Sequence, residues 1–173
     1  QAYGMDVSEE MLAAARARYP DLPFLCADAA DFAPKAPFDA ILSNAVLHWI
    51  NREKQPAVLR CVYSALKDSG RFVFEMGGKG NNAAIHRALE KAFARRGLSY
   101  AVPFYFPSAE EYQSLLEEAG FSVSFLTLFD RPTRLEGEHG LADFIRMFLK
   151  KPFEQVPPET AEAILSEAEE VLA

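Results

Sequence analysis

Four polar side chains follow short apolar runs, where a strand would end and a ligand could bind. They are Asp6, Asp28, Asn44 and Glu75. A carboxylate accepts hydrogen bonds on both oxygens, so an acid such as Asp6 suits the two hydroxyls of a ribose. Asp28, one strand-helix unit later, suits an adenine amine, with the Ala29 N–H as donor to the ring nitrogen beside it. The pair predicts an adenosine site, although Asp6 alone would serve equally well as a helix cap.

The segments around these acids alternate between strand and helix. Ser8 is a good N-cap for a helix running to Tyr19, and a second helix follows Pro56 and stops before Ser69-Gly70. The expected strands are short apolar runs at 4–6, 24–27, 38–44 and 71–76. Such strands indicate a parallel sheet covered on both faces, so the predicted fold class is a doubly wound, Rossmann-like α/β fold.

The remaining chain predicts further helices and one long strand. A helix over Ile85–Phe93 ends near Gly97, and a capping box at Ser108 and Glu111 opens a helix that ends at Gly120. We expect a strand over Phe121–Phe129. Two amphipathic helices follow, over 141–149 and 164–172.

Composition restricts the function classes. The 173 residues, half of them hydrophobic, carry a net charge of −7, so a nucleic-acid partner is not expected. No apolar stretch is long enough to span a bilayer, and we expect a cytoplasmic protein with a small-molecule substrate and no membrane partner. Cys26 and Cys61 are expected to be buried free thiols, and no metal is expected because possible ligands do not cluster. The oligomeric state stays open.

The order of four motifs resembles the class I S-adenosylmethionine-dependent methyltransferases. The motifs are Gly4-Met5-Asp6-Val7-Ser8, Ala27-Asp28-Ala29, Phe38 to Ala45 with His48-Trp49, and Leu66 to Phe72. Within that family, the stretches 44–49 and 75–82 are most similar to the small-molecule group related to trans-aconitate methyltransferase. The resemblance covers residues 2–129.

The resemblance implies roles for particular residues. Asp6 would bind the ribose of S-adenosylmethionine, Val7 and Met11 would pack on the adenine, and Asp28 and Ala29 would contact its edge. Asn44 and Ala45 would line the methionine end through backbone groups. Trp49, Tyr105 and Phe106 are candidate substrate residues, the last two within the aromatic stretch 100–107, although aromatic residues there would also serve as core anchors.

The family's glycine-rich loop and the strand before it are absent from this sequence. That strand lies centrally in the family's sheet, between the strands that end here at Asp6 and Asn44, and the family's last strand is also absent. We therefore expect residues 1–173 to be a single partial domain from within a longer enzyme. Its cofactor-binding half would be 1–82 and its substrate-side half 83–173.

The methyl acceptor determines whether a general base is needed. A carboxylate acceptor, which the trans-aconitate resemblance favours, is already ionised and needs none. For a hydroxyl or amine, His48 is the candidate catalytic base because it follows Asn44 closely. The alternative is that His48 only packs at the start of a helix.

Two other function classes stay open at this point. A nicotinamide-dependent oxidoreductase would share the Asp6 position but would have less use for Asp28 and Ala29. A non-catalytic cofactor-binding domain of the same fold is the second alternative.

Overall fold

The computed structural model describes residues 2–137 and 139–172, which form two compact units. Unit 1 comprises Gln1–Met76 and Ala109–Leu126, and unit 2 comprises Gly77–Ser108 and Thr127–Ala173. The expected halves, 1–82 and 83–173, have other bounds because residues 109–126 return to unit 1. A functional division at residue 82 stays a prediction.

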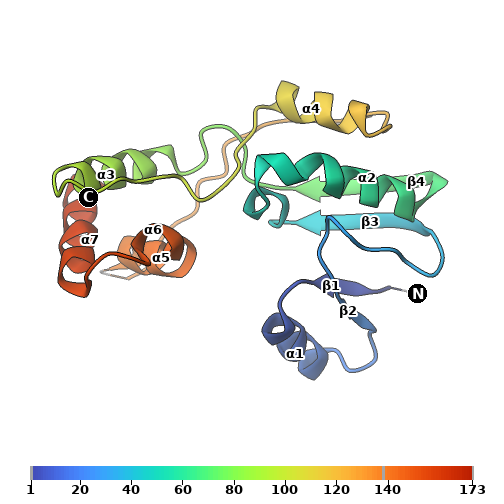
Figure 1. Ribbon diagram of the computed structural model, residues 1–173, viewed down its shortest axis with the longest axis horizontal. Coiled ribbons are helices and arrows are strands. Elements are labelled where there is room, and N and C mark those ends of the chain that lie inside the picture. The colour runs from blue at the N-terminus through green and yellow to red at the C-terminus, as the bar shows by residue number, and fades with distance from the viewer. Residues whose placement is uncertain (1, 138, 173) are drawn as a thin grey trace. The chain divides into compact units, whose positions relative to one another are not determined.

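Unit 1 begins with a parallel strand pair joined by a helix. Strand β1 (Gly4–Asp6) leads through helix α1 (Glu9–Arg18) to β2 (Phe24–Cys26) (Figure 1). The Ser8 hydroxyl accepts the Met11 N–H at 3.3 Å, so Ser8 is the N-cap that the sequence predicts. Asp6 stands opposite Cys26, and the Ala27 N–H donates to the Asp6 carbonyl at 3.0 Å. The ends of both strands therefore lie side by side.

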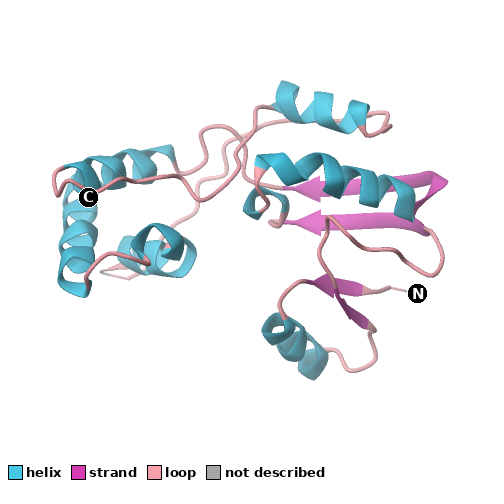
Figure 2. Cartoon of the chain, viewed as in Figure 1, coloured by secondary structure: helices cyan, strands magenta, loops and turns pink. Residues whose placement is uncertain are grey.

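A second parallel pair forms the rest of the strand structure in unit 1. Strand β3 (Phe38–Asn44) is followed by 3-10 turns η1 (Leu47–Trp49) and η2 (Arg52–Lys54), helix α2 (Gln55–Ala65) and strand β4 (Leu66–Glu75) (Figure 2). Asn44 stands opposite Glu75 in the register. This pair confirms the predicted parallel α/β arrangement, although β4 begins earlier than expected.

The two faces of the β3-β4 pair differ in burial. Helix α4 (Ala109–Glu118) packs Tyr112 against Phe74, with ring centroids 5.3 Å apart. On the other face Leu42 and Val73, which are opposite each other in the register, are 76% and 54% exposed. Within the described residues, β1 pairs with β2 and β3 with β4, and no ladder joins β1 to β3.

Two sequence-based expectations about local structure are wrong. Residues 121–129 form no strand, because Phe121 packs its ring on Phe72 without its backbone joining a ladder. Alternating apolar residues alone do not form a strand without a hydrogen-bonding partner. Cys26 is exposed rather than buried, since the short strand β2 has one neighbour and little covering it, while Cys61 is half-buried.

Unit 2 is helical. Helices α3 (Ala83–Ala94), α5 (Gly140–Phe148), α6 (Lys150–Phe153) and α7 (Pro158–Leu172) enclose a core that includes Leu89, Phe93, Ile145, Leu149 and Ile164. Glu167 on α7 pairs with Arg95 and Arg96 after α3, each at 2.7 Å. The expected helices are present, with α6 in addition. Among the residues described, no helix has the length and apolar character required to cross a bilayer.

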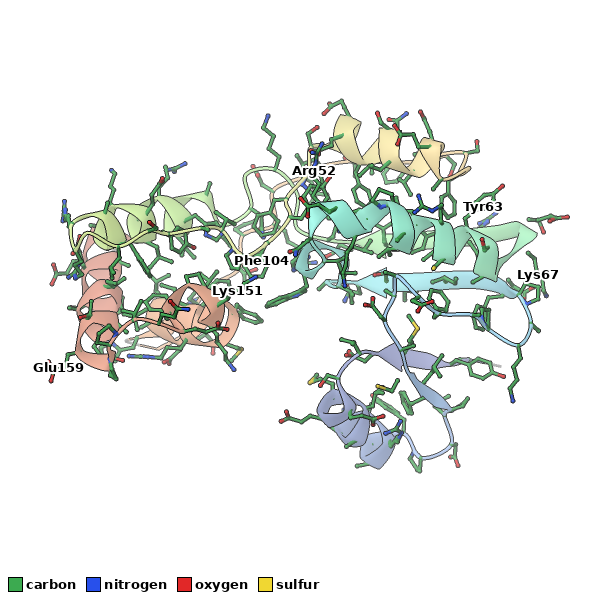
Figure 3. The ribbon with its side chains drawn as sticks, viewed as in Figure 1. Arg52, Tyr63, Lys67, Phe104, Lys151 and Glu159 are labelled. Atoms are coloured by element: carbon green, nitrogen blue, oxygen red, sulfur yellow. The ribbon has the colours of Figure 1, made fainter. Side chains whose placement is uncertain are left out.

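We predict that Gly120→Ala destabilises the full-length protein more than Gly97→Ala. Both glycines have positive φ, +103° and +69°, so alanine costs about 1 kcal/mol at either site. A Cβ at Gly120 would also lie 2.9 Å from the ring of Tyr63, which is labelled in Figure 3, whereas no atom of the described residues would lie within 4 Å of a Cβ at Gly97. The Tyr63 ring packs edge-on against Phe121, so displacing it to make room for the new Cβ should lower the free energy of unfolding by about 1–2 kcal/mol more.

Denaturant unfolding of both variants measures this difference. Adding Tyr63→Ala as background should shrink the extra cost at Gly120, because the ring is then gone. If Gly120→Ala lowered the free energy of unfolding equally in the presence and absence of the Tyr63 ring, the steric explanation would be contradicted.

Candidate functional site

Two carboxylates lie at the adjacent ends of β1 and β2. Asp6 Oδ1 accepts the Ser8 N–H at 2.8 Å, and no described residue donates to Oδ2. Asp28 Oδ1 accepts the Ala30 N–H at 2.9 Å, while Oδ2 pairs with Lys54 Nζ at 3.5 Å. The Ala30 hydrogen bond, with Lys54 nearby, lowers the pKa of Asp28. Backbone donors therefore orient both carboxylates.

The surroundings of Asp6 fit an adenosine. Val7 and Met11 are 70% and 61% exposed, leaving apolar surface next to the carboxylate. In the described part of the chain the Ala29 N–H has no acceptor, so it is open to a ligand. An open acid, an apolar surface and an open backbone donor match a ribose hydroxyl pair, a purine face and a purine edge.

The end of β3 has an unusual backbone. Ala45 has φ +56°, a left-handed conformation that costs a residue with a Cβ about 1–2 kcal/mol. Its N–H donates to the Glu75 carbonyl at 2.8 Å, which fixes the turn beside the end of β4. Strain of this kind is found preferentially at functional sites. The sequence placed Asn44 and Ala45 at a binding position, and the structure places them at this strained turn.

A buried amide holds the segment that carries His48. Gln55 is fully buried, and its Nε2 donates to the carbonyls of Leu47 at 2.9 Å and Ile50 at 2.7 Å. Its Oε1 accepts the Tyr112 hydroxyl at 3.0 Å. The turn Leu47–Trp49 has no side-chain cap of its own, so Gln55 supplies its polar partners. Gln55 is therefore a positioning residue for this turn.

His48 is half-buried in that turn. Its ring lies 5.9 Å from the ring of Trp49, which is exposed. Burial lowers the pKa of His48 below its usual value near 6.5, so the imidazole is neutral at pH 7. The protonation state suits a base, and the geometry equally suits packing.

The other predicted substrate residues, Tyr105 and Phe106, belong to unit 2 and are partly buried. Phe106 contacts the loop after β4, where a Cβ on Gly77 would lie 2.6 Å from its ring. The sequence reasoning missed Lys54, Gln55 and Cys61, whose Sγ donates to the Ala30 carbonyl at 3.0 Å. Lys54 and Gln55 stand beside Pro56 as ordinary residues of a helix start, and no local signal identifies their contacts.

Comparison with known proteins assigns the family. A sequence family described as "Methyltransferase domain" matches residues 1–70. These residues belong to the methyltransferase domain family. An uncharacterised methyltransferase of Schizosaccharomyces pombe is 35% identical over 145 residues, 76% of this chain and 55% of its own length. A trans-aconitate 2-methyltransferase of Methylobacterium nodulans is 29% identical over 167 residues, 92% of this chain and 62% of that protein.

Solved methyltransferase structures share the fold. A Haloferax volcanii complex between the Trm112 methyltransferase activator and a methyltransferase matches with TM-score 0.57 and 20% identity, over 95% of this chain and 64% of that one. A Haemonchus contortus phosphoethanolamine N-methyltransferase, solved with S-adenosylhomocysteine, matches with TM-score 0.53 and 16% identity, over 99% of this chain and 39% of that one. The predicted methyltransferase family and Rossmann-like fold class are confirmed. The chain spans about half the length of the first relative named above.

We predict that Gln55→Leu lowers the free energy of unfolding by about 2–4 kcal/mol, because it leaves two carbonyls and a buried hydroxyl without Gln55 as partner. Gln113→Leu is the matched control. Gln113 is exposed, and its one side-chain partner among the described residues is Glu117 in the same helix, so replacing it should lower the free energy of unfolding by no more than about 0.5 kcal/mol. Urea unfolding of both variants provides the comparison. If both variants lowered the free energy of unfolding equally, the buried hydrogen bonds of Gln55 would contribute no more to stability than the exposed one of Gln113.

Proposed function

We propose that the protein transfers a methyl group from S-adenosylmethionine to a small-molecule acceptor. The observation that carries this proposal is the pair of oriented carboxylates, Asp6 and Asp28, at adjacent strand ends within residues 1–70, the stretch that belongs to the methyltransferase domain family. The nicotinamide alternative is not favoured, because the relatives named above are methyltransferases.

The proposed roles follow from the groups that each residue presents. Asp6 Oδ2 accepts from ribose hydroxyls, Val7 and Met11 cover the adenine face, and Asp28 with the Ala29 N–H contacts the adenine edge. Asn44 and Ala45 offer backbone groups to the methionine end. When bound, the cofactor supplies an activated methyl on a sulfonium. The chain's own task is to orient the two reactants and exclude water.

We propose a carboxylate as the acceptor group. The support is the likeness to trans-aconitate 2-methyltransferases, whose name states a carboxylate substrate. An ionised carboxylate needs no base, so His48 would then orient the turn beside Trp49, and His48 becomes the catalytic base only for a hydroxyl or amine acceptor. Trp49, Tyr105 and Phe106 are proposed substrate contacts. We also propose a cytoplasmic location, supported by two cysteines that form no disulfide.

We further propose that the active enzyme has a strand between β1 and β3. Those two strands have free edges in the described residues, and open edges of parallel strands are otherwise costly. The exposed face bearing Leu42 and Val73 favours, in addition, a layer that covers the sheet in the active enzyme, since apolar residues on a parallel sheet usually have helices packed over them.

We predict that Asp6→Asn in the full-length protein weakens S-adenosylmethionine binding about 10- to 100-fold. The amide keeps an Oδ1 acceptor for Ser8 but loses the charge and the second acceptor, a difference of about 1.4–2.8 kcal/mol. Asp39→Asn is the matched control, because Asp39 lies on β3 and pairs with Lys67 at the surface. Calorimetric titration compares them. Unchanged affinity in Asp6→Asn would refute the proposed ribose contact.

We predict that His48→Gln changes kcat with a carboxylate acceptor less than about threefold. Because burial keeps the pKa of His48 below 6.5, a true base would lose activity only as pH falls below that lowered value. The pH profile of kcat should therefore be alike for both proteins down to pH 5. A loss near 100-fold, together with disappearance of an acid limb, would instead assign His48 as the base.

A further inference from the structure

Unit 2 contains a cavity of about 310 Å³ whose lining includes none of the strand-end residues described above. Its walls come from residues 80–90 and 100–106, which are the first half of α3, the loop before it and the aromatic segment. A volume of this size lies at the lower limit of usual small-molecule sites.

One wall of the cavity holds a buried histidine with an unsatisfied nitrogen. His86 is 7% exposed, and its Nδ1 lies 2.7 Å from the hydroxyl of Tyr100. Its Nε2 is buried and has no hydrogen-bond partner among the described residues. Buried polar atoms in folded proteins are normally paired, so this nitrogen requires an explanation.

The Tyr100 hydroxyl determines what Nε2 can bind. Among the described residues, that hydroxyl has His86 Nδ1 as its one hydrogen-bonding partner; the tautomer of the imidazole sets which of the two donates, and we take the hydroxyl as the donor. Burial, with the Glu90 carboxylate nearby, raises the pKa of Tyr100, and burial lowers that of His86, so both groups are neutral. The proton of the imidazole is then on Nε2, which is a donor. The missing partner is an acceptor atom.

The rest of the lining favours an oxyanion with one charge. Arg87 lines the cavity and forms no ion pair in the described residues, so its guanidinium is open to an anion. Glu90 also lines it and offsets part of that charge, which disfavours a doubly charged phosphate. Val102 and Phe106 give the cavity an apolar wall for the body of the ligand.

We propose that this cavity binds a small carboxylate, with one carboxylate oxygen accepting from His86 Nε2 and the other pairing with Arg87. Since Nε2 is covered, the oxygen reaches it after a small shift of the lining. The site does not depend on the proposed methyl transfer. Its ligand is either the methyl acceptor or a second carboxylate, and both have the same chemistry.

Calorimetry on the full-length protein without S-adenosylmethionine tests the proposal, with trans-aconitate and benzoate as probes and benzamide as the neutral control. We expect both carboxylates to bind and benzamide to bind at least tenfold more weakly. His86→Phe and Arg87→Ala should each weaken carboxylate binding at least tenfold. Lys91→Ala, one turn further along α3 and outside the lining, is the matched control and should bind as the parent does. Thermal unfolding checks that His86→Phe remains folded, which is expected because the loss of the Tyr100 hydrogen bond is offset by removal of the unpaired Nε2.

The ¹⁵N resonance of His86 Nε2 gives a second readout, since the bound oxygen should shift it while His48 and His139 stay unchanged. Competition of benzoate with the methyl acceptor in steady-state kinetics would mean that the acceptor occupies the cavity, and its absence would mean a second ligand; either outcome supports the carboxylate site. No binding at 20 mM probe, equal affinity in the parent and His86→Phe, or a water molecule as the sole occupant in a crystal grown with benzoate would overturn it. If the full-length protein bound the carboxylates but transferred no methyl group, the proposed function would be refuted and the carboxylate site would stand.

Discussion

Parallel strand pairing is the constraint on which the proposed cofactor site depends. Parallel partners end at the same edge of a sheet, so Asp6 and Asp28 become neighbours although a helix separates them in sequence. Antiparallel pairing would send the two acids to opposite edges. A slip of one residue in the register would turn every side chain of the slipped strand to the other face of the sheet. The register that sets Asp6 opposite Cys26 is therefore as important as the acids themselves.

The end of β3 needs a different kind of support. The chain there leaves the ladder through a left-handed alanine and two short 3-10 turns, neither of which has a side-chain cap. Short turns leave carbonyl groups that a helix would have paired. Gln55, in the first turn of α2, supplies donors to two of these carbonyls and is itself held by Tyr112 from α4. The helix layer thus fixes the turn that carries His48.

Local sequence signals predicted much of this structure, and they failed where contacts between distant residues determine the conformation or burial of a segment. Ser8 caps α1 and Gly97 follows α3 as expected, because both depend on neighbouring residues. The apolar alternation from Phe121 did not produce a strand, since a strand also needs a ladder partner. The burial of Gln55 depends on Tyr112, 57 residues further along, and no pattern near Gln55 contains that information.

The cofactor site was predicted as a set of strand ends, and local sequence patterns could identify some of its residues but not others. Asp6 and Asp28 could be found because an acid after a short apolar run is a local pattern. Lys54 and Cys61 contact the segment around Asp28 through folding of α2 onto the β2 end, which composition does not reveal. For Tyr105 and Phe106 the sequence indicated aromatic content but not that Phe106 would line a cavity of its own unit.

Two buried polar side chains in the described residues, Gln55 and His86, show how a structural role differs from a binding role. Both N–H donors of the Gln55 side chain and its carbonyl oxygen are engaged within unit 1, so the side chain already has partners at both ends of its amide. His86 has one nitrogen used and one without a partner, although the rings of Tyr100, Phe104 and Phe106 surround it. An apolar side chain of that shape would cost less to bury, since an unpaired donor costs about 1–3 kcal/mol. The hydrogen bond between His86 Nδ1 and Tyr100 offsets part of that cost, and the carboxylate oxygen proposed above would offset the rest.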